Sequence, residues 1–515
     1  MSFKIPFNAP YVFVDEAFDF LKDALERGAL SGDGPNTKYC TKWFAQRFGY
    51  ERALLTPSCT AALEMTALLL DLQPGDEVIV PSYTFVSTAN AFALRGVKLC
   101  FADSSIHTPN VSIASIMSLV TKHTKAIVVV HYAGMPLDVR PLLATNIPLV
   151  EDCAHAIGAV DPFTQRPIGV AGCMSTFSFH QTKNIPIGEG GMLVVNDPDL
   201  WERAQIVREK GTNRTRFIEG RDTFYTWQSL GSSYLLSDID AAFLRASLIH
   251  FDEIQERRVA IWKTYNSNVF VSSVFDKPIL EVSLANAHMY YLKFRSCSLQ
   301  KIFCDWMKKS SVLVATHYVP LEISPFIATS NISVHPSCPH SNDWHQTLVR
   351  LPLFFGLTEA NQKVVCDCVN EFTLQHGFAL RAVLREHYEA IRLIRNENRE
   401  AFWCTKEVEY ETHQIFMKLH SSTYRVALDK SGVVGFVGHV DGDLRIACTS
   451  SNQGSGLACF MFSAFLKDYP FITIRVRRSN VRSLAFFKKL GYQPEPIAFS
   501  NGSDPVPLVL IENQN

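Results

Sequence analysis

Short apolar segments alternate with helix-like segments in the first part of the chain. Between residues 53 and 196, the apolar runs show no polar alternation. Strands that are apolar on both faces are typical of a parallel sheet covered by helices on both sides. The pattern therefore predicts an α/β architecture. The predicted strands are 77–81, 98–101, 126–131 and 148–151, and the predicted helices are 60–72 and 89–95.

The rest of the chain changes its pattern twice. A helix-rich part after residue 200 leads to a mixed segment, 286–374, which ends in a predicted helix over 359–374. Near residues 375–377 the pattern restarts, which indicates a second domain of ordinary size. The sequence thus predicts one domain over 1–376 and another over 378–515, joined by a short linker. The second is expected to have a strand and turn over 380–389, a charged helix, and strands at 424–428, 433–440, 444–447 and 472–476.

Length and composition agree with two globular domains. A chain of 515 residues exceeds one ordinary domain, and 47% hydrophobic with 19% charged residues is a normal globular composition. The formal net charge of -1 offers no overall field for nucleic acid or an acidic membrane. Neither a secretory signal nor a membrane-spanning run is recognisable. The 13 scattered cysteines form no paired CxxC motif, so we expect no metal site and a reduced, cytoplasmic protein.

The segments 150–155 and 175–191 carry the candidate chemistry of the first domain. Asp152 directly follows a buried strand, Lys183 lies in FSFHQTKN, and a glycine cluster follows at 188–191. Pyridoxal phosphate (PLP) requires a lysine amine, an acid for its ring nitrogen, donors for its phosphate and a flat side chain on its ring. Each residue alone has an ordinary alternative: a strand-end cap, an exposed lysine, helix caps or a core aromatic. Their combined order favours the cofactor.

These motifs resemble the DegT/DnrJ/EryC1/StrS family of sugar aminotransferases. The resemblance covers residues 4 to about 374 through IPFNAP, GDGPNT, LLTPSCTAALEMTALLLDLQPGDEVIVPSYTFVSTANAFALRG, HYAG, EDCAHAIG, FSFHQTKN, GEGG and REKGTNRTRF. It implies the aspartate-aminotransferase-like (type I) fold of PLP enzymes. By this resemblance, Lys183 is the catalytic Schiff-base lysine and Asp152 the partner of the pyridine nitrogen.

The resemblance also implies the remaining cofactor contacts. His155 stands near the PLP hydroxyl, and Ser233 replaces an asparagine that in many relatives binds the phosphate from the partner subunit. Family members are typically homodimers, so we expect at least a dimer. His317 and Tyr318, in THYVPL, resemble substrate-side residues of relatives. Thr60, Ala61 and Ser178 are expected at the phosphate, and Phe85 on the ring.

The resemblance further implies a substrate and a reaction. We expect transfer of an amino group from glutamate to a nucleotide-linked 4-keto-6-deoxy sugar, turning dTDP-4-keto-6-deoxyglucose into dTDP-4-amino-4,6-dideoxygalactose. Some relatives carry histidine in place of the lysine and act as dehydratases, whereas Lys183 favours transamination. A competing hypothesis is a regulator that has borrowed the aminotransferase fold.

A glycine-rich turn is the candidate site of the second domain. The order of strand, QGSGLA, helix, strand, Asn480 and helix resembles the GNAT superfamily of acetyl-CoA-dependent N-acetyltransferases over about 380–498. A turn of this kind that opens a helix can donate N–H groups to a pyrophosphate, although a solvent loop has the same composition. The resemblance implies an α/β GNAT domain that binds acetyl-CoA through Gln453, Gly454, Ser455, Gly456, Leu457, Ala458 and Asn480.

Phe487 departs from the GNAT pattern. Many relatives carry a tyrosine there as general acid, and a phenyl ring has no proton to donate. One hypothesis is N-acetylation of the new sugar amine, giving dTDP-Fuc4NAc. The alternative is a non-catalytic domain that binds acetyl-CoA or stabilises the dimer. The helix with Arg395, Asn396 and Arg399 resembles one in relatives that acetylate amino sugars, or is a solvated face.

Overall fold

The chain forms two compact units. The computed structural model describes residues 3–279, 284–330, 333–334, 337–402, 404–494 and 506–509. The first unit comprises Met1–Ser267 and Lys277–Val365, and the second comprises Asn268–Asp276 and Cys366–Asn515. Segment 268–276 belongs to the second unit because β8 (Val271–Ser272) pairs with β13 (Ala379–Ala382). The sequence did not predict this exchange of a segment between the two parts.

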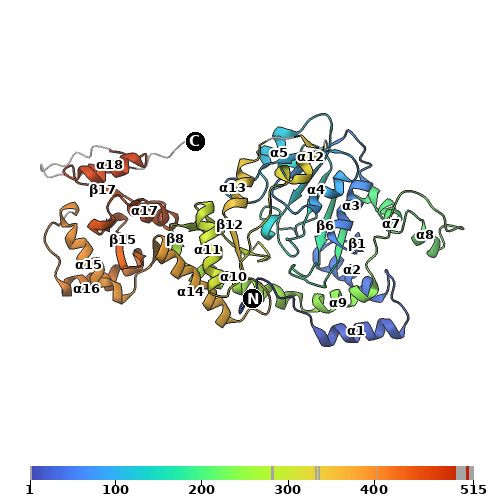
Figure 1. Ribbon diagram of the computed structural model, residues 1–515, viewed down its shortest axis with the longest axis horizontal. Coiled ribbons are helices and arrows are strands. Elements are labelled where there is room, and N and C mark those ends of the chain that lie inside the picture. The colour runs from blue at the N-terminus through green and yellow to red at the C-terminus, as the bar shows by residue number, and fades with distance from the viewer. Residues whose placement is uncertain are drawn as a thin grey trace. The chain divides into compact units, whose positions relative to one another are not determined.

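An eight-stranded sheet is the centre of the first unit (Figure 1). Five neighbouring pairs, between β6 and β11, are parallel, as the apolar runs predicted. The exception is β7, which is antiparallel to both neighbours, so the sheet is mixed. Its order is β1 (Ala53–Thr56), β7 (Gly191–Val195), β6 (Met174–Ser178), β5 (Leu149–Asp152), β4 (Thr124–Val130), β2 (Glu77–Pro81), β3 (Lys98–Ala102) and β11 (Ser333–Val334).

Helices cover both faces of this sheet because both faces are apolar. In β2, Val78 and Val80 pack into one core, whereas Ile79 packs into another on the opposite face. One face is covered by α3 (Cys59–Leu69), α4 (Ser87–Ala93) and α7 (Trp201–Arg208). The other is covered by α2 (Pro35–Phe48) and α9 (Asp238–Ile249), and by α5 (Ile113–Leu119) and α6 (Arg140–Leu143). Helix α1 (Val14–Glu26) packs on α9.

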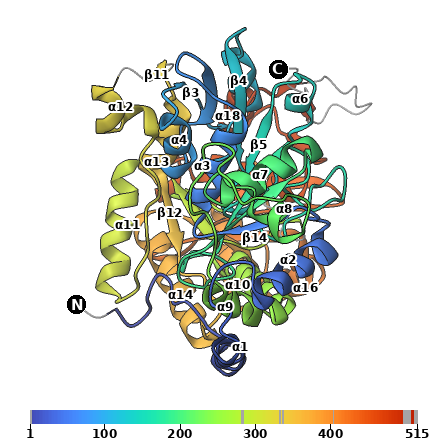
Figure 2. The same cartoon turned by 90° about the vertical axis from the view of Figure 1, so that its right-hand side faces the viewer.

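The remaining elements of the first unit follow the sheet in sequence. Strands β10 (Tyr290–Phe294) and β12 (Leu348–Leu351) pair antiparallel, and α11 (Cys297–Lys309) and α13 (Pro339–Thr347) pack on them. Helix α8 (Arg214–Ile218) and its flanking loops project from the side of the unit (Figure 1), the side that faces the viewer in Figure 2. The other helices are α10 (Phe251–Asn268), α12 (Pro325–Thr329) and α14 (Glu359–His376). The last residue of α10 and the part of α14 from Cys366 onward belong to the second unit.

The second unit is built on an antiparallel sheet in the order β16-β15-β14-β13-β8. Helices α15 (Tyr388–Glu397) and α16 (Tyr410–His420) cover one face, and α17 (Leu457–Asp468) and α18 (Val481–Lys489) pack with the opposite set of strand residues. The predicted strands are confirmed as β14 (Tyr424–Asp429), β15 (Gly432–Val440), β16 (Asp443–Cys448) and β17 (Ile474–Val476). A smaller sheet joins β17, β19 (Val506–Val509) and β18 (Gln493–Pro494).

Of the helices in the described ranges, none combines the length and apolarity needed to cross a lipid bilayer.

Candidate active site

A cavity of about 520 Å³ lies in the first unit at the carboxyl ends of the central strands. Its position is the one that open α/β sheets use for ligands, because the loops that leave parallel strands meet at that edge. Asp152 ends β5, Ser178 ends β6, and Lys183 follows in the next loop. The chain therefore brings the candidate residues together at one edge, and the cavity is large enough for a cofactor and a small substrate.

Lys183 lines this cavity, and the pKa of its amine is lowered. Burial lowers the pKa of Lys183 to about 8, although the negative charges of Cys59, if ionised, and Asp152 act in the opposite direction. Near neutral pH a useful fraction of the amine is thus unprotonated. An unprotonated lysine is a nucleophile and a base, which is the chemistry that the sequence predicted at this position.

Asp152 is held rigidly at the floor of the cavity. Its Oδ2 accepts a hydrogen bond from Thr88 Oγ1 at 2.8 Å, and its Oδ1 accepts one from the N–H of Ala154 at 3.1 Å. Burial raises the pKa of Asp152, whereas these two hydrogen bonds and the charge of Lys183 lower it. A buried carboxyl in this setting favours a cationic partner. Sequence reasoning missed Thr88, although its hydroxyl in the STAN segment was a visible signal.

Hydroxyl groups and a helix start form one corner of the cavity. Ser58 caps α3 by accepting the N–H of Ala61 at 3.1 Å, and Thr60 Oγ1 lies 2.7 Å from Ser87 Oγ. Ser178 contributes a further hydroxyl. This corner suits an anion because the helix dipole and free N–H groups point toward it. Ser58 and Thr60 line the cavity, whereas the predicted N–H of Ala61 donates to Ser58 and Ala61 is not among the lining residues.

Gly191, the first residue of β7, makes this corner possible. A Cβ atom there would lie 2.4 Å from the backbone nitrogen of Cys59 and 2.4 Å from the carbonyl carbon of Ser58. Neither backbone atom can move without shifting the start of α3. The glycine cluster noted in the sequence therefore has a steric reason at this position: it lets a strand lie directly against the N-terminal end of α3.

Aromatic and imidazole rings form the opposite wall. The hydroxyl of Tyr318 is hydrogen-bonded to Nε2 of His155 at 3.3 Å. The ring of His155 stacks on that of His288, with ring centroids 4.3 Å apart. Nδ1 of His317 is hydrogen-bonded to the hydroxyl of Tyr132. Burial lowers the pKa of His155 and of His317 well below the usual value, so both rings are neutral. The predicted residues His155, His317 and Tyr318 all line the cavity.

Phe85 and Ser233 have contrasting positions. The Phe85 side chain is 55% exposed and lines the cavity, with its ring centroid 6.0 Å from that of Tyr318. It is therefore not a core aromatic, and its ring is available to a ligand. Ser233 is exposed and does not line the cavity of its own chain. Its backbone bridges to Glu209, next to the loops around α8.

Arg350 is a lining residue that the sequence analysis missed. It lies on β12 within the apolar segment LVRLPL, where a single charged residue in a buried strand was the available signal. Phe7 and Asn8, from the extended N-terminal segment, also line the cavity.

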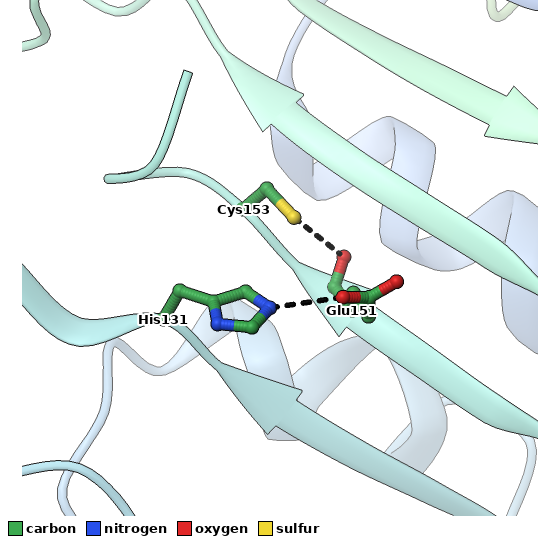
Figure 3. A group of neighbouring side chains, drawn as sticks. All are labelled: His131, Glu151 and Cys153. Atoms are coloured by element: carbon green, nitrogen blue, oxygen red, sulfur yellow. Dashed lines mark hydrogen bonds and ion pairs between the residues drawn. The ribbon is translucent and has the colours of Figure 1, made fainter. Parts of the chain in front are cut away.

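A second buried group, His131, Glu151 and Cys153, lies beside this site (Figure 3). His131 Nε2 is 3.0 Å from Glu151 Oε2, and Nδ1 accepts the N–H of Leu137. Glu151 Oε1 accepts two backbone N–H groups, from Ala171 and Gly172, and the Cys153 thiol donates to the Glu151 carbonyl. The group thus hydrogen-bonds the segments that contain Leu137 and Ala171 to the ends of β4 and β5, next to Asp152.

The glycine-rich turn of the second unit is exposed, and Gly454 and Gly456 adopt φ of +84° and +87°. Several predicted side chains already have partners. Gln453 is hydrogen-bonded to Arg482, and Asn480 caps α18 by accepting the N–H of Ser483 at 3.1 Å. Leu457 is buried in the core, and Ser455 and Ala458 flank it. A ligand at this turn would therefore meet backbone N–H groups before side chains.

Three other predicted positions in the second unit have structural contacts. Phe487 is 3% exposed and packs against Phe462 with ring centroids 5.4 Å apart. Arg395 donates to the carbonyl of Lys406 at 2.6 Å, and Asn396 exchanges hydrogen bonds with the backbone of Val408. Arg395 and Asn396 thus hold the loop between α15 and α16, a role distinct from both the substrate contact and the solvated face considered above.

Comparison with known proteins identifies the first unit. The model of the DegT/DnrJ/EryC1/StrS aminotransferase family matches residues 13–370. The chain belongs to this family. An uncharacterised protein of Methanocaldococcus jannaschii is 29% identical over 348 residues, which cover 65% of this chain and 89% of that protein. The spore coat polysaccharide biosynthesis protein SpsC of Bacillus subtilis is 28% identical over 379 residues, which cover 71% and 96%.

Solved structures of aminotransferases share the fold. The aminotransferase TlmJ of Streptoalloteichus hindustanus superposes with a TM-score of 0.63 at 26% identity, over 72% of this chain and 98% of that one. The PMP form of the sugar aminotransferase Spr1654 of Streptococcus pneumoniae gives a TM-score of 0.66 at 22% identity, over 72% and 99%. The α/β aminotransferase fold predicted for the first unit is confirmed.

The residues of the cavity fit the cofactor that the family implies. A helix start with four neighbouring hydroxyls suits a phosphate, and the buried Asp152 suits a ring nitrogen that carries a proton. The amine of Lys183, with a pKa of about 8, suits an aldehyde. All three lie around one cavity of about 520 Å³.

Proposed function

We propose that this chain transfers the amino group of glutamate to a 4-keto-6-deoxy sugar nucleotide with PLP as cofactor. The best candidate acceptor is dTDP-4-keto-6-deoxyglucose, which would give dTDP-4-amino-4,6-dideoxygalactose. One observation carries this proposal: Lys183, with a pKa lowered to about 8, shares a cavity with the buried Asp152 and a helix start suited to an anion. SpsC, a relative, is named for polysaccharide biosynthesis, which agrees with a sugar substrate.

Particular residues of this chain would hold the cofactor. Asp152 would bind the ring nitrogen, His155 would lie near the ring hydroxyl, and Phe85 would cover the ring. Thr60, Ser178 and the start of α3 would bind the phosphate. When bound, PLP supplies an aldehyde that accepts an amino group and a ring that takes up electrons from the substrate carbon.

Lys183 would then move the proton in both half-reactions. Its Nζ would remove the proton from the α-carbon of glutamate, whose amino group passes to the cofactor while an oxygen from water replaces it in 2-oxoglutarate. In the second half-reaction Nζ would deliver a proton to C4 of the sugar, where the amino group replaces the carbonyl oxygen, which leaves as water. A pKa near the working pH lets the same amine accept and return a proton without a large energetic cost in either direction.

A homodimer would complete the site. The loops around α8 expose several large apolar side chains, which a monomer would leave in water. Ser233 follows directly on these loops and would contact the phosphate of the partner subunit. The exposed side chains are Phe217, Ile218, Phe224, Tyr225, Trp227 and Leu230.

We further propose that the second unit, taken as a GNAT-like domain over 378–515, acetylates the new amine. Strands β16 and β17 are joined by one parallel bridge between Asp443 and Thr473 and then continue in different sheets. The turn with Gly454 and Gly456 follows β16 and opens α17. Diverging strands beside a helix start leave backbone N–H groups for a pyrophosphate, which supports acetyl-CoA as the co-substrate.

The acetyl transfer needs little from side chains. The unprotonated sugar amine would attack the thioester carbonyl, the carbon–sulfur bond would break, and the thiolate of coenzyme A would take up the proton lost by the amine. Phe487 is buried and has no proton to give, so positioning of the amine would supply much of the rate. The same burial favours the alternative of a non-catalytic acetyl-CoA-binding domain.

Mass spectrometry of the product would test both proposals. The full chain is incubated with PLP, glutamate and the keto sugar nucleotide, with and without acetyl-CoA. We expect the amino sugar nucleotide without acetyl-CoA and its N-acetyl derivative with it. A product that stops at the free amine would refute the second step, and an unchanged keto sugar would refute the first.

A further inference from the structure

Arg350 places a guanidinium group in the wall of the cavity on a rigid support. In the sheet, Arg350 lies opposite Tyr291 of β10 on one side and Ala315 on the other. The backbone N–H of Arg350 donates to the carbonyl of Ala315 at 2.7 Å. Because its N–H and its C=O are both hydrogen-bonded to Ala315, and β10 pairs with the other edge of the strand, the backbone of Arg350 has little freedom. The sheet thus fixes the backbone that carries this lining side chain.

The guanidinium uses few of its donors within the protein. Nη2 donates to the carbonyl of Thr316 at 3.2 Å, and the ring of Phe7 lies 4.7 Å from the guanidinium carbon. Nε is buried and has no hydrogen-bond partner. An arginine has five N–H donors, and a buried donor without a partner is destabilising. The protein therefore keeps an incompletely bonded cation at this wall.

No carboxylate in the described part of the chain pairs with Arg350. Two acids line the cavity. Asp152 accepts hydrogen bonds from Thr88 and Ala154, and Glu189 lies 3.7 Å from the ring of His180. The positive charge of Arg350 also contributes, after burial, to lowering the pKa of Lys183, His155 and His317. An anion bound to Arg350 would thus be near the reacting amine.

We propose that Arg350 binds the α-carboxylate of the amino donor, an inference that rests on the aminotransferase function proposed above. A planar carboxylate accepts two parallel hydrogen bonds from a guanidinium, and the uncommitted donors of Arg350 suit it. The α-carboxylate is one bond from the carbon that bears the amino group, so it stays near Lys183 during the reaction. In a 4-keto sugar nucleotide, the diphosphate is on the opposite side of the hexose ring from the keto carbon. Arg350 would therefore favour the donor over the acceptor.

The test compares four forms of the full chain loaded with PLP: wild type, Arg350→Gln, Arg350→Lys and Arg257→Gln. Arg257 is a matched control because it donates to one backbone carbonyl, that of Leu357 at 2.7 Å, and does not line the cavity. Calorimetry with glutarate, an unreactive dicarboxylate, measures binding without turnover. Release of 2-oxoglutarate from glutamate and amination of the keto sugar nucleotide are followed separately.

Arg350→Gln should weaken glutarate binding and raise the glutamate concentration for half-maximal 2-oxoglutarate release by about 10- to 100-fold, as expected for charged hydrogen bonds. Amination of the sugar by enzyme already carrying the amino group should change by less than about threefold, since that step contains no donor carboxylate. The glutarate affinity of Arg350→Lys should fall between those of the wild type and Arg350→Gln. Lysine keeps the positive charge but loses the planar guanidinium that donates two parallel hydrogen bonds. Arg257→Gln should match the wild type.

Equal weakening of both half-reactions, or weakening of sugar amination alone, would overturn the inference and assign Arg350 to an anion of the sugar nucleotide. Unchanged glutarate binding in Arg350→Gln would also overturn it. If the wild type releases no 2-oxoglutarate, the aminotransferase proposal fails, whereas glutarate binding still decides the role of Arg350.

Discussion

The two candidate sites of this chain differ in what they offer a ligand. In the first unit, the site is a cavity lined by a lysine, an aspartate, imidazoles and an arginine. In the second unit, it is an exposed turn whose polar side chains contact each other, as Gln453 does with Arg482. Burial changes the protonation of side chains in the first site, whereas the second relies on backbone geometry. Side-chain substitutions should therefore be severe in the first unit, and backbone changes should matter more in the second.

Removal of the Lys183 amine should have the largest effect. Lys183→Ala should slow release of 2-oxoglutarate from glutamate by at least about 10³-fold, because nucleophile and proton carrier are lost together. Acetylation of a supplied amino sugar nucleotide should remain at the wild-type rate. Parallel assays of the two steps measure this. Loss of both activities would mean that the sites are not chemically independent.

Asp152→Asn should be the next most damaging change. The amide keeps the shape of the side chain but removes the negative charge that would stabilise a protonated ring nitrogen. We expect amino transfer to fall about 10²-fold, as for loss of one preorganised electrostatic group. Steady-state rates with glutamate and the keto sugar nucleotide measure the change. A rate near that of the wild type would remove Asp152 from the proposed role.

A backbone change should separate the second site from the first. Gly456→Val places a β-branched residue at φ +87°, which costs about 1–2 kcal/mol or distorts the turn. Acetyl-CoA affinity measured by calorimetry should fall about tenfold, with amino transfer unchanged. Gly442→Val is the matched control, because Gly442 has φ +80° and open space around it in another turn. Equal losses in the two variants would mean that general strain, not the turn, is responsible.

The pH dependence of cofactor attachment should sharpen the account of Lys183. The protonated amine has no lone pair, so the rate at which PLP attaches to the cofactor-free chain should rise with pH and level off above about 8. Because the charge of Asp152 raises the pKa of Lys183, the midpoint should move to lower pH in Asp152→Asn. Absorbance after mixing reports the rate. A midpoint near the ordinary lysine value of about 10.4 would contradict the effect of burial.

Phe487→Tyr should have the smallest effect on chemistry. The side chain is buried between Phe462 and Tyr492, so a new hydroxyl would lack a partner and reduce the free energy of unfolding by about 1–3 kcal/mol. The rate of acetyl transfer should not rise. Denaturant unfolding and the acetylation assay measure the two quantities. Faster acetyl transfer would indicate that this position is close to the leaving thiolate after all.

Sequence periodicity predicted the local elements well. Strands such as 77–81 and 424–428 were recognisable because apolar runs of strand length between turn residues have few other structures available. The antiparallel β7 and the pairing of β8 with β13 were not predictable in this way, since the direction and partner of a strand depend on contacts far apart in the chain.

The sequence by itself determined the lysine, the aspartate and the hydroxyl groups at the ends of consecutive elements, because parallel strands bring their carboxyl ends to one edge. Only the tertiary structure decided that Thr88 holds Asp152, that Phe487 belongs to the core and that Arg350 enters the cavity. The physical reason is that burial, protonation and the pairing of charges arise from neighbours that are distant in sequence, whereas strand and helix signals are local.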